Sequence, residues 1–129
     1  MAIHQKCLAL RNAMVEFEPL LMELMHALQS RDADRRDIAT TKLGDWKLKY
    51  KDSGIVGSMY MALMAVVSKE SPSNDIERAQ EQIEAIEGVH MLKSAAYDAV
   101  EAIRCLSVRN VENVEVFAST AATKARSVK

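Results

Sequence analysis

Apolar residues recur at alternating steps of four and three along the first part of the chain. This row consists of Ile3, Cys7, Leu10, Met14, Phe17, Leu21, Leu24 and Leu28. Such a heptad pattern is typical of a helix that packs against other helices. A second apolar row widens the face, as in a bundle core: Leu8, Val15 and Met22. The sequence therefore predicts one long amphipathic helix from about Ala2 to Gln29.

Pro19 falls inside this predicted helix. It has no amide hydrogen to donate to the carbonyl of Val15, and its ring crowds that turn. The apolar register continues across the proline without a shift, whereas a true break would usually lose it. We therefore expect a kinked helix, and the alternative is an end at Phe17 followed by a restart.

Two further helices follow a polar segment. Asp32 or Asp34 can cap the first of them, which should run to about Lys51. Ser53 is the expected cap of the next helix, from about Gly54 to Lys69, which is apolar nearly all round. A helix without a polar face is either central in a bundle or covered by a partner chain.

The second half of the chain contains one ambiguity, at Gly88. Asn74 is the expected cap of a fourth helix, with Glu77 completing a capping box. The apolar phase shifts by one residue at Gly88, which either ends this helix or bends it. Because no loop residues follow, we expect one continuous or bent helix to Leu106. Asn110 should cap a last helix that runs to about Arg126.

The composition agrees with helices: the 129 residues include only 4 glycines and 2 prolines. We expect one domain spanning residues 1–129, an all-α antiparallel bundle of about five helices. The N-terminus does not have the uninterrupted apolar core of a secretory signal, and the longest apolar stretch, Gly54 to Val67, is too short to cross a membrane. With Cys7 and Cys105 expected as reduced thiols, the sequence favours a cytoplasmic protein, in a host cytoplasm if the chain is viral or phage-encoded.

Candidate catalytic and metal-binding residues are sparse. Two Glu-x-x-His triplets, Glu23 to His26 and Glu87 to His90, have the spacing of di-iron ligands in helical bundles. His26 falls opposite the apolar seam, however, and the two middle helices contain no glutamate before Glu70. No nucleophile elbow or phosphate-binding loop is present either. The sequence predicts no metal, no cofactor, no small-molecule substrate and no enzymatic activity.

The charges are unevenly distributed, although the formal net charge is only −1. Residues 31–51 contain seven basic and four acidic residues, and residues 75–87 contain five acidic residues and one basic residue. A basic helix with aromatic residues can bind phosphates. The candidate nucleic-acid face consists of Arg35, Arg36, Lys42, Lys47, Lys49 and Lys51. Trp46 and Tyr50 lie among these residues but continue the apolar stripe, so we expect them in the core.

Methionine is frequent, and its flexible side chain suits adaptable contact surfaces as well as cores. We expect an all-apolar third helix to present more surface than one chain of this length can enclose. We therefore predict a helical protein–protein interaction or assembly module, of the adaptor, chaperone or inhibitor kind, that forms homo-oligomers. The expected partner interface consists of Met22, Met25, Ile55, Met59, Met61 and Met64. The alternative is a nucleic-acid-binding domain that uses the basic face.

Overall fold

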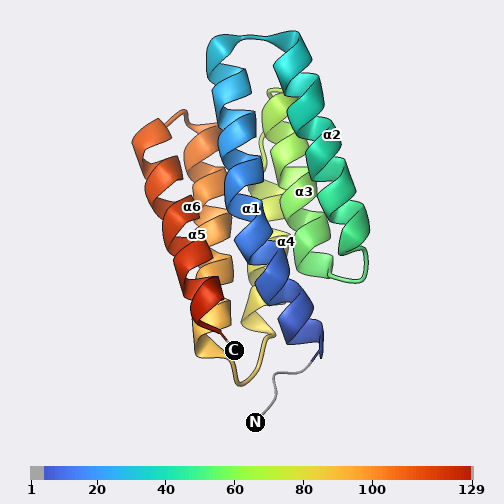
Figure 1. Ribbon diagram of the computed structural model, residues 1–129, viewed down its shortest axis with the longest axis vertical. Helices are drawn as coiled ribbons and strands as arrows, with labels where there is room; N and C mark the ends of the chain where they lie inside the picture. Colours follow the sequence, from blue (N-terminus) through green and yellow to red (C-terminus); the bar gives the residue numbers. More distant parts are fainter. Residues whose placement is uncertain (1–4, 129) are drawn as a thin grey trace.

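Six helices joined by short turns make up residues 5–128, the part of the chain that this computed structural model describes (Figure 1). The helices are α1 (Gln5–Ser30), α2 (Ala33–Lys49), α3 (Gly54–Val67), α4 (Ser73–Glu84), α5 (His90–Ser107) and α6 (Val111–Ser127). The predicted all-α bundle is confirmed, with six helices instead of about five. Ala2 and Ile3, where the first helix was expected to begin, lie outside the described residues.

Helix α1 is the centre of the bundle. It packs against α2, α3, α5 and α6, while α4 packs against α3 and α5. Successive helices run in opposite directions along the long axis of the molecule (Figure 1). This arrangement follows from the short connections, which leave each helix beside the one before it.

The predicted seam of α1 forms the core. Leu10, Met14, Phe17, Leu21 and Leu24 are buried, and Cys7 and Leu28 at its ends are half-buried. Burying a side chain of this size stabilises a fold by roughly 1.5–3 kcal/mol. The helix also continues through Pro19 and does not end at Phe17. Pro19 is exposed, so its ring does not disturb the buried face.

Three of the predicted helix caps are present. The side chain of Asp32 accepts hydrogen bonds from the amides of Asp34 and Arg35, which selects Asp32 from the two expected alternatives. Ser53 accepts from the amide of Val56 at the start of α3. Asn110 accepts from the amide of Asn113 at the start of α6. Each cap satisfies an amide that the first helical turn leaves without a backbone acceptor.

The predicted capping box of the fourth helix is wrong. Helix α4 begins at Ser73, so Asn74 already lies in its first turn. Pro72 precedes the helix, and the hydroxyl of Ser71 accepts a hydrogen bond from the amide of Ser73. A proline has a backbone angle suited to the start of a helix, which explains why α4 starts earlier than Asn74.

The continuous helix predicted across Gly88 is also wrong. Helix α4 ends at Glu84 and α5 begins at His90, with Gly88 at a φ of 81° between them. Glycine adopts this left-handed conformation without the strain that a side chain would cause. Lys93 closes the turn, because its ammonium donates to the carbonyl oxygen of Glu84 at 3.1 Å. The one-residue shift in the apolar phase marks two separate helices.

Helix α3 is enclosed mainly by its own chain, which corrects the expectation that a partner must cover it. Its buried residues are Ile55, Val56, Ser58, Met59, Ala62, Leu63 and Val66. Helices α1, α2, α4 and α5 all pack against it, so a bundle of this size provides more neighbours than expected. Met61 is the large side chain of α3 that is exposed, with 48% of its surface accessible.

Candidate functional site

The six residues predicted as a partner interface do not share one surface. Met25 and Met59 have no exposed surface, and Ile55 is 7% exposed. Met22 and Met64 are half-buried. Among the six, Met61 is the one whose side chain is largely accessible. The buried members fill the core of the bundle, so a partner can reach only Met61 and the edges of Met22 and Met64.

A different apolar surface lies between α2 and α3, which we call the α2–α3 groove. It has a volume of about 350 Å³ and is lined by Gly44, Lys47, Leu48, Lys51, Ser53, Gly57 and Tyr60. Leu48 contributes an exposed apolar side chain to this lining, with 68% of its surface accessible. A side-chain carbon placed on Gly57 would meet no atom within 4 Å. The groove therefore exists because two helices present glycines where a larger side chain would fill the space.

Sequence reasoning missed this groove. Leu48 lies outside the apolar stripe that α2 buries, at Ala39, Leu43 and Trp46. A large apolar residue on the polar side of a helix was the signal that could have revealed it. Gly44 and Gly57 gave a second signal. Glycine weakens a helix, so its presence inside one indicates a position where close packing or open space is needed.

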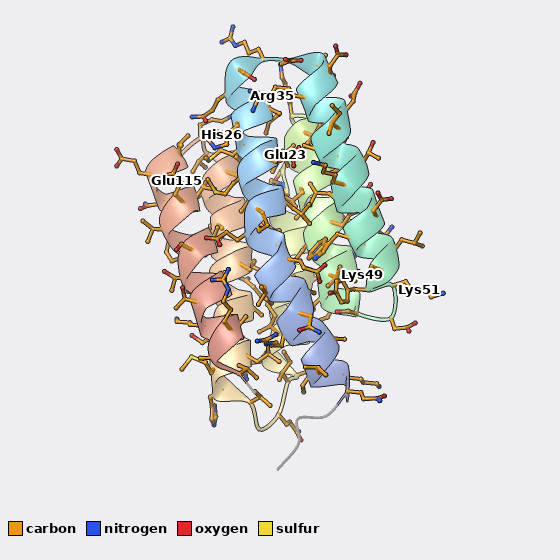
Figure 2. The ribbon with its side chains drawn as sticks, in the orientation of Figure 1. Glu23, His26, Arg35, Lys49, Lys51 and Glu115 are labelled. Carbon is orange, nitrogen blue, oxygen red and sulfur yellow. The ribbon has the colours of Figure 1, made fainter. Side chains whose placement is uncertain are left out.

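The predicted nucleic-acid face is partly neutralised by neighbouring acids. Lys42 pairs with Glu23 at 3.0 Å and Lys49 pairs with Glu16 at 2.7 Å, both across to α1. The ammonium of Lys47 lies 4.9 Å from the centre of the Tyr60 ring. Figure 2 shows Arg35 near one end of α2, with Lys49 and Lys51 at the other end. Arg36 lies 3.9 Å from the carboxylate of Asp37. The basic groups are thus spread along the helix, and three of them already have carboxylate partners.

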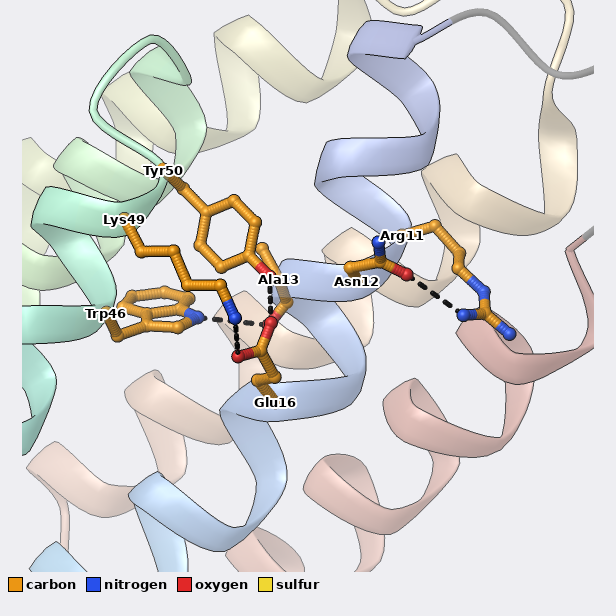
Figure 3. Close-up of polar contacts among 7 residues, drawn as sticks. All are labelled: Arg11, Asn12, Ala13, Glu16, Trp46, Lys49 and Tyr50. Atoms are coloured by element: carbon orange, nitrogen blue, oxygen red, sulfur yellow. Dashed lines mark hydrogen bonds and ion pairs between the residues drawn. The ribbon is translucent and has the colours of Figure 1, made fainter.

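Trp46 of α2 and Tyr50, which follows the helix, both contact α1. Trp46 lies in the core as expected, whereas Tyr50 is half-buried at its edge. The indole of Trp46 donates to the carbonyl oxygen of Ala13 at 3.1 Å (Figure 3), and its ring lies 5.4 Å from that of Phe17. Trp46 is 3% exposed and so is unavailable to stack on a nucleobase. The hydroxyl of Tyr50 donates to Glu16, which also binds Lys49.

A second hollow lies where the start of α1 meets the α2–α3 and α4–α5 turns. It has a volume of about 410 Å³, within the range of small-molecule sites. Its apolar lining includes Cys7, Leu10, Tyr50, Ile55 and Ile86. The charged lining residues carry both signs: Lys6, Lys49, Asp52 and Glu87. Because opposite charges surround it, the hollow does not specify the charge of a ligand.

The Glu-x-x-His triplets do not assemble into a metal site. Glu23 is engaged by Lys42, and His26 is exposed on the same helix, as expected (Figure 2). Glu87 lies in the α4–α5 turn and His90 is exposed at the start of α5. Across residues 5–128, no group of three or more histidine, cysteine or carboxylate side chains is placed to bind a metal. His4 lies outside this range.

Both cysteines are free thiols. Cys105 is buried in α5, and this burial raises the pKa of its thiol, with the nearby carboxylate of Glu101 adding to the effect. A raised pKa disfavours the thiolate, which is the nucleophilic form. Cys7 is half-buried beside the second hollow.

In comparisons with known proteins, no family model, curated protein or solved structure matches this chain. None of the described helices is long and apolar enough to cross a membrane.

Proposed function

We propose that this chain is a helical protein–protein interaction module that associates with itself and has no catalytic chemistry of its own. The α2–α3 groove and the exposed Met61 of α3 are the observation that carries the proposal. Leu48 and Met61, which are 68% and 48% exposed, stand on the two helices that form this groove. Association would remove this apolar surface from water, which is the main favourable term in most protein contacts.

The rest of the described chain supports an interaction role over an enzymatic one. The residues that line the α2–α3 groove and the second hollow include no histidine that could act as a general base. The thiol of Cys105 has a raised pKa because it is buried. A nucleic-acid role would need free cations, whereas Lys42 and Lys49 are paired with glutamates of α1.

Sedimentation equilibrium over a wide concentration range tests the proposal. We expect a reversible oligomer in the unmodified protein and weaker association in Met61→Asp, because a carboxylate would have to be buried in the contact. Val116→Asp is the matched control, since Val116 is also an exposed apolar residue, at 58%, but lies on α6. A protein that is monomeric at every concentration would rule out self-association.

Salt separates this proposal from nucleic-acid binding. Binding to phosphates weakens steeply as salt increases, because it depends on counterion release. A contact with an apolar centre should largely survive the same change. Tight, salt-sensitive binding of DNA or RNA that is abolished by Lys47→Glu and Lys51→Glu would instead favour the nucleic-acid function.

A further inference from the structure

Helix α3 presents a narrow open stripe between α2 and α4. Gly57, Met61, Met64 and Ala65 follow one another at helical spacing and are exposed or half-buried. On one side of this stripe, Tyr60 faces Gly44 and Lys47 of α2. On the other side, Ser58 donates to Gln82 of α4 at 2.9 Å. The stripe therefore has α2 along one edge and α4 along the other.

The two edges carry opposite charge. On the edge formed by α2, Lys47 and Lys51 line the groove itself. On the edge formed by α4, Glu77 and Glu81 are exposed one helical turn apart. Arg78 between them is also exposed, but it is paired with Asp75 at 3.7 Å, so this edge is acidic overall. A surface with an apolar centre, a basic edge and an acidic edge is complementary to a second copy of itself, provided that the copies are arranged to bring unlike edges together.

Contacts with α3 place the two edges at matching heights, that is, at similar positions along the axis of α3. Lys47 lies over the ring of Tyr60, while Gln82 is bonded to Ser58. Ser58 and Tyr60 are two residues apart, which is about 3 Å along a helix axis. Glu81 precedes Gln82 by one residue, about 1.5 Å. Lys47 and Glu81 therefore lie within about one helical turn of the same height, on opposite sides of α3.

We propose that two copies of this chain form a symmetric dimer whose two-fold axis runs parallel to α3, with α2 of each copy against α4 of the other. This proposal rests on the proposed function of self-association. A two-fold axis in that direction exchanges the two edges and leaves heights unchanged. Lys47 of one copy therefore meets Glu81 of the second copy, and the two Met61 side chains lie near the axis. An axis at right angles to α3 would instead set Lys47 of one copy against Lys47 of the other. The two positive charges would repel each other and oppose this arrangement.

Thiol cross-linking distinguishes these arrangements. In a Cys7→Ser background, in which the remaining Cys105 is buried, a short bismaleimide is added to mixtures of Lys47→Cys and Glu81→Cys chains. We expect cross-linked dimers from the mixture and little from Lys47→Cys alone. Efficient cross-linking of Lys47→Cys to itself would overturn the proposal, because it would place α2 against α2.

Charge reversal provides an independent measurement by sedimentation equilibrium. We expect Lys47→Glu to weaken the dimer at least tenfold, and Lys47→Glu with Glu81→Lys in the same chain to restore most of the loss. Lys47→Glu with Glu115→Lys is the matched control, because it has the same net charge but the second change is on α6, away from this face (Figure 2). Equal rescue by both pairs would overturn the proposal.

The outcomes separate this inference from the proposed function. If the protein dimerises but Lys47 and Glu81 neither cross-link nor rescue each other, self-association stands and this arrangement is wrong. If the protein is monomeric at every concentration, both are wrong.

Discussion

A few single side chains join helices that are far apart in the sequence. Arg11 of α1 donates from Nε to the carbonyl oxygens of Ala125 and Val128 at 3.2 and 3.3 Å. Another nitrogen of the same guanidinium donates to Arg126 at 3.4 Å. These acceptors are at the C-terminal end of α6, where carbonyls lack helical partners and where the helix dipole favours a cation. Arg11 thus fixes the last helix onto the first.

We expect Arg11→Ala to lower the free energy of unfolding by about 1–2 kcal/mol, because it removes these hydrogen bonds and leaves the carbonyls to water or to no donor. Urea denaturation measures the change. Arg126→Ala is the control, since its pair with Glu18 at 3.7 Å is on the surface and should contribute about 0.5 kcal/mol or less. Equal effects of the two substitutions would contradict this role of Arg11.

Cys105 should make stability depend on alkaline pH. Burial raises the pKa of its thiol above the ordinary value of 9.0, so the folded protein holds the proton more tightly than the unfolded chain. This contribution is complete below the unfolded pKa and is lost as the pH rises toward the folded pKa. We expect Cys105→Ala to lose less stability than the unmodified protein between neutral and alkaline pH. Urea melts at several pH values measure this difference. In the same melts, Cys7→Ala should lose as much stability with rising pH as the unmodified protein does.

At the scale of whole elements, the glycines have different roles. Gly88 supplies the left-handed residue that separates α4 from α5, whereas Gly57 lies inside α3 beside open space. Neither position is short of room, since a side-chain carbon at either one would meet no atom within 4 Å. The difference between them is therefore one of backbone conformation and not of packing.

We expect opposite effects from alanine at these two positions. Gly88→Ala should destabilise the protein by about 1 kcal/mol, because its φ is unfavourable for a side chain. Gly57→Ala should stabilise the monomer by about 0.5–1 kcal/mol, because alanine favours a helix more than glycine does. Thermal melts at low protein concentration measure both. A destabilising Gly57→Ala would show that the open space is needed by the monomer itself.

At the scale of the molecule, burial is unequal among the helices. Helix α2 buries Ala39, Leu43 and Trp46 out of 17 residues, whereas α5 buries nine of its 18. Helix α2 lies at one side of the bundle (Figure 1), where its buried face rests on α1 and α3. Local opening requires less free energy where fewer apolar contacts are lost.

We expect the amides of α2 to exchange with solvent faster than those of α5 when the protein is dilute. Hydrogen exchange followed by mass spectrometry tests this expectation. If the dimer proposed above forms, raising the concentration should slow exchange in α2 and α4 and leave α6 unchanged. Uniform protection of α2 and α5 in the dilute protein would contradict the argument from burial.

Much of the fold was predictable because it depends on local sequence pattern. The heptad seam of α1 and the caps at Asp32, Ser53 and Asn110 each concern residues within a few positions of one another. The prediction was wrong at Gly88, where two helices with adjacent apolar phases resembled one bent helix. At the start of α4, Pro72 and Ser71 took the place expected for Asn74.

The candidate site was less predictable, because exposure depends on which helices become neighbours. The pattern of α3 showed that all its faces are apolar, but it did not show that four other helices would pack against it so that Met59 is buried and Met61 remains open. The α2–α3 groove likewise depends on Gly44 and Gly57 lying on helices that meet. The local pattern of residues is enough to specify the helices and their apolar faces, since hydrogen bonding and side-chain period are local. Which apolar surface remains accessible depends on how the helices pack together, since burial is a property of packed neighbours.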